Sequence, residues 1–167
     1  VNAQPATPLA PTASITQPDC TTATGTITVT STINSGDTFS IDGTNYQTSP
    51  IFLGVQPNTY SVTIRSAAGC ISAATSTTLN AQPATPAAPT ASVTQPDCTT
   101  ATGTIAVTST INSGDTFSID GVTYTNTTGS FTGVIPGVYN VTTKNTTGCI
   151  SAATAVVVNA PPAPAIA

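Results

Sequence analysis

The chain has 167 residues, with six acidic side chains, two basic ones, no His and a formal net charge of −4. No basic stripe could neutralise nucleic-acid phosphates or hold the chain on an anionic membrane surface, and no apolar run approaches the roughly 20 residues of a membrane-spanning helix. The composition therefore excludes nucleic-acid binding and predicts no membrane insertion. Thr, Ser and Asn carry the polarity instead, which suits an exposed extracellular surface.

The chain consists of two tandem copies of one sequence unit. Cys20 recurs as Cys98, 78 positions on, and Phe52 recurs as Phe131, 79 positions on. A fixed period of this length with matched linkers is typical of an array of small domains. We predict a linker at 1–11, a first repeat at 12–80, a Pro/Ala-rich linker at 81–89, a second repeat at 90–159, and the start of a further linker at 160–167.

Each repeat is predicted to be a small antiparallel β-sandwich. Good helix formers are scarce, while Thr, Val, Ile, Gly and Pro abound, and apolar residues alternate with polar ones. Seven short strands with turns between them favour a sandwich. The strands predicted in the first repeat are 13–16, 26–30, 38–41, 45–48, 51–53, 60–64 and 71–79. The predicted core of that repeat is Ile15, Ile27, Val29, Phe39, Ile41, Phe52, Tyr60, Val62, Ile64, Ile71 and Leu79.

Two local motifs recur at matching places. Asp42-Gly43 and Asp120-Gly121 predict tight turns, because Asp before Gly favours chain reversal. Tyr60 and Tyr139 each follow a Pro turn and open a strand. This placement predicts the tyrosine corner of Greek-key sandwiches, in which the ring packs in the core and the hydroxyl bonds backbone a few residues upstream.

The linkers predict stiffness. Pro83 to Pro89 alternates Pro with Ala and Thr, and such segments favour an extended polyproline II conformation of roughly 3.1 Å per residue. The upstream segment Pro5–Pro11 has a similar composition. Both are interpreted as semi-rigid spacers.

The four cysteines predict disulfides. Repeat symmetry favours the pairs Cys20–Cys70 and Cys98–Cys149 among the three pairings that four cysteines allow, because each unit must fold by itself. Such bonds imply an oxidising compartment. Four reduced, buried thiols are the alternative. A zinc site is not expected without His or a CxxC pair, and no metal, cofactor or catalytic residue is predicted.

The recurring sequence elements of the two repeats are similar to those of a known family. The elements Ser40-Ile41-Asp42-Gly43, Tyr60-Ser61-Val62 and Gly69-Cys70, repeated in the second copy, resemble the tandem repeats of giant Bacteroidetes cell-surface adhesins of the SprB type. The resemblance covers essentially the whole chain. It implies an immunoglobulin-like sandwich, secretion, service as a surface fibre or adhesin stalk, and no catalytic residues.

The aspartates, a Thr ladder and three sequons offer weaker alternatives. Asp37, Asp42, Asp115 and Asp120 could supply a carboxylate pair or a calcium site, but turn chemistry explains them better. The ladder from Thr24 to Thr32 could bind ice if it were flat, although sandwich strands twist. The glycosylation sequons begin at Asn126, Asn140 and Asn145, and surface Thr could carry O-linked sugar.

The sequence thus predicts a structural, non-enzymatic unit of an extracellular cell-surface filament. Its expected partners are neighbouring repeats of the same chain or identical chains. Leu9, Val55 and Ile166 are predicted to pack at the junctions between repeats. One alternative is an adhesive module for surface glycans or matrix, with Tyr46 and Tyr124 as its aromatic platform. The other alternative is a separately polymerising filament subunit.

Overall fold

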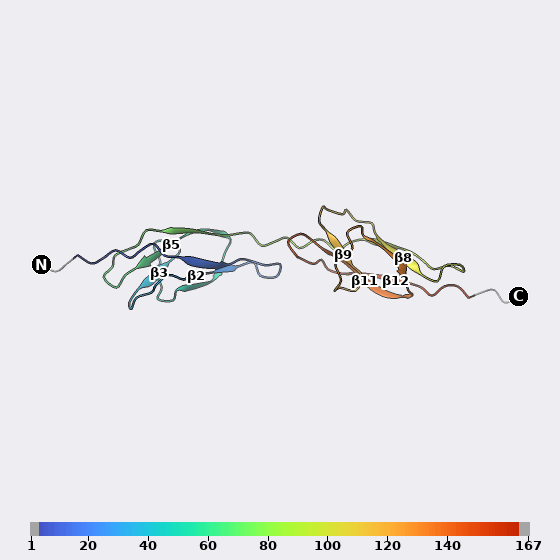
Figure 1. Cartoon of the computed structure of the whole chain (residues 1–167), viewed down its shortest axis with the longest axis horizontal. Coiled ribbons are helices and arrows are strands. Elements are labelled where there is room, and N and C mark those ends of the chain that lie inside the picture. The colour runs from blue at the N-terminus through green and yellow to red at the C-terminus, as the bar shows by residue number, and fades with distance from the viewer. Residues whose placement is uncertain (1–3, 164–167) are drawn as a thin grey trace. The chain divides into compact units, whose positions relative to one another are not determined.

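The computed structural model describes residues 4–163, so that Ile166 lies outside the described residues. The chain divides into two compact units, Val1–Pro83 and Ala84–Ala167 (Figure 1). The strands of the first unit are β1 (Ala13–Thr16), β2 (Gly25–Val29), β3 (Thr38–Ser40), β4 (Ile51–Val55), β5 (Asn58–Arg65) and β6 (Thr75–Leu79). Those of the second are β7 (Ala91–Thr94), β8 (Gly103–Val107), β9 (Thr116–Ser118), β10 (Ser130–Val134), β11 (Gly137–Lys144) and β12 (Thr154–Val158).

The strand order of each unit is that of an immunoglobulin-like sandwich. In the first unit β1-β2-β4 form one antiparallel sheet and β3-β5-β6 form the other, and the second unit repeats this with β7-β8-β10 and β9-β11-β12. These orders correspond to strands A-B-E and C-F-G of immunoglobulin-like domains, with no D strand among residues 4–163. The predicted fold class is confirmed, and the described part of the chain contains no helix. It accordingly offers no helical segment of a length and apolarity suited to crossing a bilayer.

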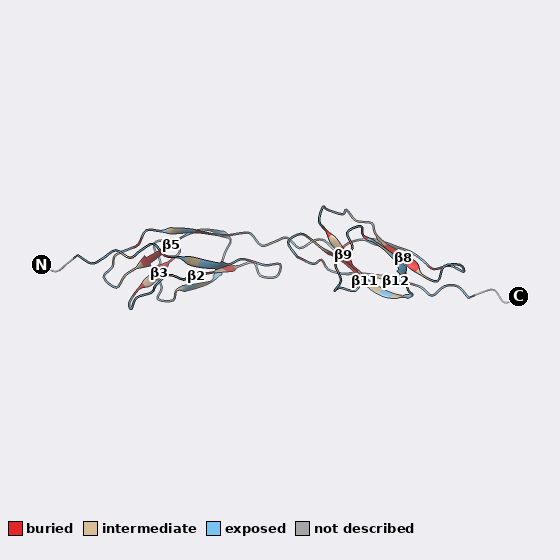
Figure 2. Cartoon of the chain, viewed as in Figure 1, coloured by how far each residue is buried: buried red, intermediate tan, exposed pale blue. Residues whose placement is uncertain are grey.

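The core of each unit lies between its two sheets. On β2 the alternation predicted from the sequence is present, since Ile27 and Val29 are buried and the intervening Thr28 is half-buried. The buried apolar residues of the first unit are Ile27, Val29, Phe39, Val55, Val62, Ile64 and Leu79, with Ala13, Ile41, Phe52 and Tyr60 packed against them. Figure 2 shows burial concentrated on the strands, while most linker and loop residues are exposed. Each core is small.

Three expectations about burial are wrong. Ile15 retains 36% exposure because β1 is an edge strand with β2 on one side only. Ile71 is 48% exposed, since it lies in the loop before β6 and makes only an isolated bridge to Arg65. Val55, predicted to pack at a junction between repeats, is instead 7% exposed within its own core.

Two predicted strands are much shorter than expected. Over 45–48 only Gln47 pairs, in an isolated bridge to Phe39. The last strand begins at Thr75 instead of Ile71, because the Ser72 hydroxyl accepts the Ile64 amide at 3.0 Å. A side chain thereby takes the place of a backbone acceptor and ends the regular ladder.

The last proline of each linker belongs to the domain that follows it. Pro11 and Pro89 are both buried. The Pro11 carbonyl accepts a hydrogen bond from the Thr75 hydroxyl at 2.6 Å, and the Pro89 carbonyl accepts one from the Thr154 hydroxyl. The exposed spacer between the repeats therefore ends one residue before the predicted boundary, and its end is fixed to the second unit.

Candidate functional site

The Ser-Ile-Asp-Gly motif forms a closed hydrogen-bonded turn. The Ser40 hydroxyl donates to Asp42 Oδ1 at 2.8 Å and accepts the Gly43 amide at 2.9 Å. Asp42 Oδ1 also accepts the amides of Thr44 and Asn45 at 2.8 and 2.7 Å. Gly43 has φ of 77°, in the left-handed region that other residues rarely adopt. These bonds explain why Ser40 is fully buried although it is polar.

The second repeat builds the same turn. Ser118 donates to Asp120 Oδ1 at 2.6 Å, and Gly121 has φ of 75°. Hydrogen bonding to the ionised form holds the pKa of both aspartates well below the usual range. The first cause is the Asn45 side chain for Asp42 and the Ser118 hydroxyl for Asp120. Both carboxylates are therefore ionised acceptors that fix a loop.

The other four aspartates also serve their own loops. Asp37 Oδ2 accepts the Asn34 amide at 2.8 Å, and Asp115 does the same for Asn112 at 3.1 Å. Asp19 Oδ1 accepts the amide and hydroxyl of Thr21, each at 2.8 Å, which lowers the pKa of this carboxyl. Asp97 repeats that arrangement with Thr99 and Thr100, and its pKa is lowered first by the Thr99 side chain. Among the described residues no three metal-binding side chains gather into a cation site.

Tyr60 and Tyr139 make the hydrogen bond predicted for a tyrosine corner. The Tyr60 hydroxyl donates to the Gln56 carbonyl at 2.9 Å, and the Tyr139 hydroxyl donates to the Ile135 carbonyl at 2.9 Å. Each ring is half-buried and packs against its core. The bond ties β5 and β11 to the turn that precedes them.

The rings of Tyr46 and Tyr124 each have a basic side chain over one face, a contact that the sequence did not predict. The guanidinium of Arg65 lies 4.2 Å from the Tyr46 ring centroid, and the ammonium of Lys144 lies 5.6 Å from that of Tyr124. Arg65 and Lys144 are the two basic side chains of the whole sequence. Their matched positions, one repeat apart, could have suggested a shared structural partner. One face of each ring is thus occupied by a cation, and the Tyr46 hydroxyl hydrogen-bonds Thr63 at 3.1 Å.

The cysteines do not form the predicted intradomain pairs. Cys70 and Cys98 are free thiols, whereas Cys20 and Cys149 are disulfide-bonded. Both expected bonds, Cys20–Cys70 and Cys98–Cys149, are therefore wrong, since each would need one of the free thiols.

The strand topology gives the physical reason. Cys20 follows Gln17, whose side chain bonds the Thr78 carbonyl and the Asn80 amide at the end where the chain leaves the unit. Cys70 follows the far end of β5, and its sulfur contacts the Pro5 carbonyl at 3.8 Å where the chain enters. A strand of eight residues spans about 26 Å, far beyond the roughly 4.4–6.8 Å between Cα atoms that a disulfide requires. The two cysteines of a repeat lie at opposite ends of the sandwich.

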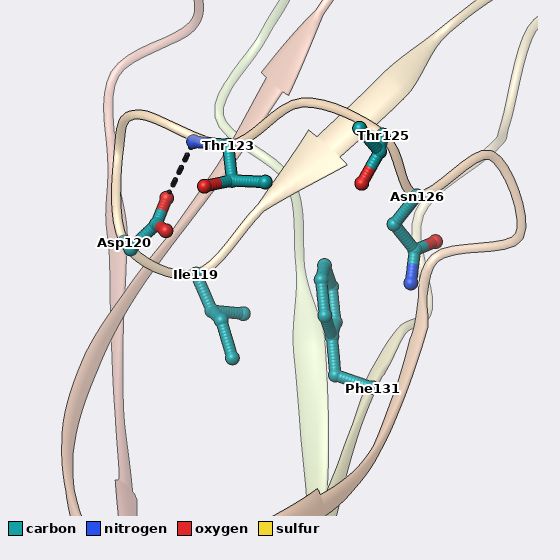
Figure 3. Close-up of a pocket in the computed structure, with 6 residues that line it drawn as sticks. All are labelled: Ile119, Asp120, Thr123, Thr125, Asn126 and Phe131. Carbon is teal, nitrogen blue, oxygen red and sulfur yellow. Dashed lines mark hydrogen bonds between the residues drawn. The ribbon is translucent and has the colours of Figure 1, made fainter.

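The second unit has a shallow hollow of about 280 Å³ beside its Ser-Ile-Asp-Gly turn. Ile119 and Phe131 supply its apolar part, and Asp120 turns to accept the Thr123 amide at 2.7 Å (Figure 3). Thr125 and Asn126 complete the lining. The carboxylate is committed to the turn, and the lining holds no pairing of a nucleophile with a base.

Two of the three sequon asparagines are engaged in loop hydrogen bonds. The Asn126 amide nitrogen donates to the Ser130 carbonyl at 2.6 Å, and that of Asn145 donates to the Ala84 carbonyl at 2.9 Å. Asn140 is exposed on β11. In the Thr ladder, Thr24, Thr26 and Thr28 are half-buried, so the ladder is not a flat exposed face.

Comparisons with known proteins add little to this geometry. No family model matches the chain, and no curated protein matches it. Among solved structures, the chain is similar to domains 7, 8 and 9 of the S-layer protein SbsC, at 14% sequence identity and a TM-score of 0.30. The match covers 92% of this chain and 61% of that structure, so the chain spans less than two thirds of its length. A likeness this low carries no functional argument.

Proposed function

We propose that this chain is a tandem-repeat segment of an extracellular cell-surface filament or adhesin stalk, with a structural role and no catalytic activity. The observation that carries the proposal is the duplication of one immunoglobulin-like sandwich together with its proline-rich linker. Repetition of a folded unit supplies reach, spacing and multivalency. The resemblance to SprB-type adhesin repeats supports the same role.

The linker chemistry supports a spacer. Pro11 and Pro89 are buried and hydrogen-bonded at the start of their domains, so each linker joins its domain through a fixed point. The segment between Asn80 and Pro89 has no helix or strand and is rich in Pro. Proline restricts the backbone and keeps such a segment extended. The linker therefore has the composition of an extended spacer.

The use of polar side chains supports an exposed location. The aspartates accept hydrogen bonds within their own loops, and Arg65 and Lys144 lie over aromatic rings. These carboxylates and cations are engaged by groups of their own unit. The disulfide-bonded state of Cys20 and Cys149 fits an oxidising compartment.

The proposal is tested by immunogold electron microscopy of cells that express the protein. Antibody raised against the chain is applied to intact cells and, as the control, to permeabilised cells. We expect equal labelling of both, with gold along surface fibres. Labelling that requires permeabilisation would overturn the proposal.

A further inference from the structure

The two cysteines of each repeat mark its two ends. The leading end of a unit is the end at which the preceding linker enters. The trailing end is the end at which the chain leaves the unit. Cys70 lies at the leading end of its unit, beside the Pro5 carbonyl. Cys149 has the same place in the second unit, where neighbouring Asn145 bonds the Ala84 carbonyl.

The trailing end is defined equally well in both units. The Gln17 side chain near Cys20 bonds the Asn80 amide at 2.8 Å. In the second unit the Gln95 side chain near Cys98 bonds the Asn159 amide at 2.8 Å. Cys20 and Cys98 thus occupy equivalent trailing-end positions, and Cys70 and Cys149 occupy equivalent leading-end positions.

The oxidation states differ between equivalent positions. At the trailing end Cys20 is disulfide-bonded while Cys98 is a thiol, and at the leading end Cys149 is bonded while Cys70 is a thiol. Each free thiol therefore has an equivalent in the other repeat that does form a disulfide. The strand length excludes a disulfide within one repeat, so neither free cysteine can pair with the other cysteine of its own unit.

We propose that Cys98 pairs with Cys70 of another copy of this chain, so that this disulfide joins two copies instead of closing one repeat. The free thiols are the leading-end cysteine of one repeat and the trailing-end cysteine of the other. They are complementary, so a chain offers one of each to its neighbours and extends head to tail. Cys98 is exposed and Cys70 is half-buried, so both are accessible.

The chemistry of the link is thiol–disulfide exchange. One thiolate attacks an external disulfide oxidant such as oxidised glutathione, forms a mixed disulfide and releases one reduced thiol. The second thiolate then attacks the protein sulfur of that mixed disulfide and releases the second reduced thiol. Two thiol protons and two electrons leave the protein, and one S–S bond forms between two chains.

The inference rests on the proposed array function and can be tested separately from it. Purified chain is incubated with oxidised glutathione at increasing protein concentration and separated by mass without reductant. We expect a ladder of multiples of 16.5 kDa that reductant collapses. Absence of a ladder would overturn the inference while leaving surface labelling of fibres, and hence the proposed function, intact.

Peptide mapping identifies the linked cysteines. A protease that cleaves before aspartate separates all four, because Cys20, Cys70, Cys98 and Cys149 fall in the peptides 19–36, 42–96, 97–114 and 120–167. We expect peptide 42–96 joined to 97–114. Links between two copies of the same peptide would instead show head-to-head or tail-to-tail dimers and overturn the head-to-tail proposal.

Serine variants supply the matched controls. Cys70→Ser or Cys98→Ser alone should yield no species larger than two chains, and an equimolar mixture of the two variants should yield the mixed dimer. The double variant should remain a single chain, with its circular dichroism spectrum unchanged because both replaced thiols were free. A ladder that persists in the double variant would place the links at other cysteines and refute the assignment.

Discussion

Replacing Gly25 with Ala should destabilise the first repeat, because a methyl group has no room at this position. An ideal Cβ built on Gly25 would lie 2.3 Å from Leu79 Cδ2 and 2.5 Å from the Thr16 carbonyl oxygen. The Leu79 side chain can rotate, but the Thr16 oxygen belongs to the backbone of β1 and can move only with its strand. Gly25 has no positive φ, so the cost is one of packing and not of backbone conformation.

The expected loss follows from the costs of overpacking. Inserting a methyl group into a packed core costs about 1–3 kcal/mol, and a backbone obstacle favours the upper half of this range. The Gly→Ala change also restricts the unfolded chain, which offsets about 0.4–1 kcal/mol. We therefore expect a net decrease of about 1–2.5 kcal/mol in the free energy of unfolding of the first unit.

The measurement is urea unfolding of the whole chain, with hydrogen exchange and mass spectrometry to assign the loss to one unit. Faster exchange should be confined to 12–80, with the second repeat as internal reference. Gly137→Ala is the matched control, because its Cβ would meet only the Tyr139 ring, at an ordinary contact distance of 3.4 Å. The first repeat also carries a side chain at the equivalent position, Asn58. A Gly25→Ala cost below about 0.5 kcal/mol, or an equal cost for Gly137→Ala, would refute the packing argument.

Three further predictions concern single contacts, each measured by urea unfolding. Tyr60→Phe removes the hydroxyl bond to the Gln56 carbonyl and should cost about 0.5–1.5 kcal/mol; no change would show that the corner bond is not stabilising. Asp42→Asn should be less stable than the parent chain above pH 3.8, the reference pKa, and the difference should shrink as the pH falls from there toward the lowered pKa of the folded state. A difference that is constant from pH 7 to pH 2 would contradict this, because the carboxylate contributes only while it is ionised. Arg65→Ala should cost about 0.5–1 kcal/mol by removing the cation over the Tyr46 ring, whereas Arg65→Lys, which copies the second repeat, should cost less; equal costs for the two variants would exclude a cation–π contribution.

Local sequence determined the strands and turns because their signals are short in range. The alternation over Gly25–Val29 fixes which side chains face the core, and both Ile27 and Val29 are buried as predicted. The Ser-Ile-Asp-Gly motif contains every side chain needed to close its own turn, since donors and acceptors lie within five residues of one another. The tyrosine corner likewise joins residues only four positions apart, Gln56 and Tyr60.

Features that depend on distant contacts were not predictable in the same way. Burial of Ile15 depends on whether a strand lies at the edge of its sheet, which alternation alone cannot show. The stack of Arg65 on Tyr46 joins residues 19 positions apart that meet only after β3 pairs with β5. The close approach of Leu79 to Gly25 also exists only once the two sheets pack together.

The sequence by itself determined the repeat, the all-β class, the turns and the paucity of charge, because these are properties of composition, period and neighbouring residues. Only the tertiary structure decided the role of the cysteines. Symmetry between repeats favoured a bond within each unit, but it carries no information about distance. The eight-residue strand β5 separates the two ends of the sandwich, and this length keeps the two cysteines of a repeat too far apart to bond to each other.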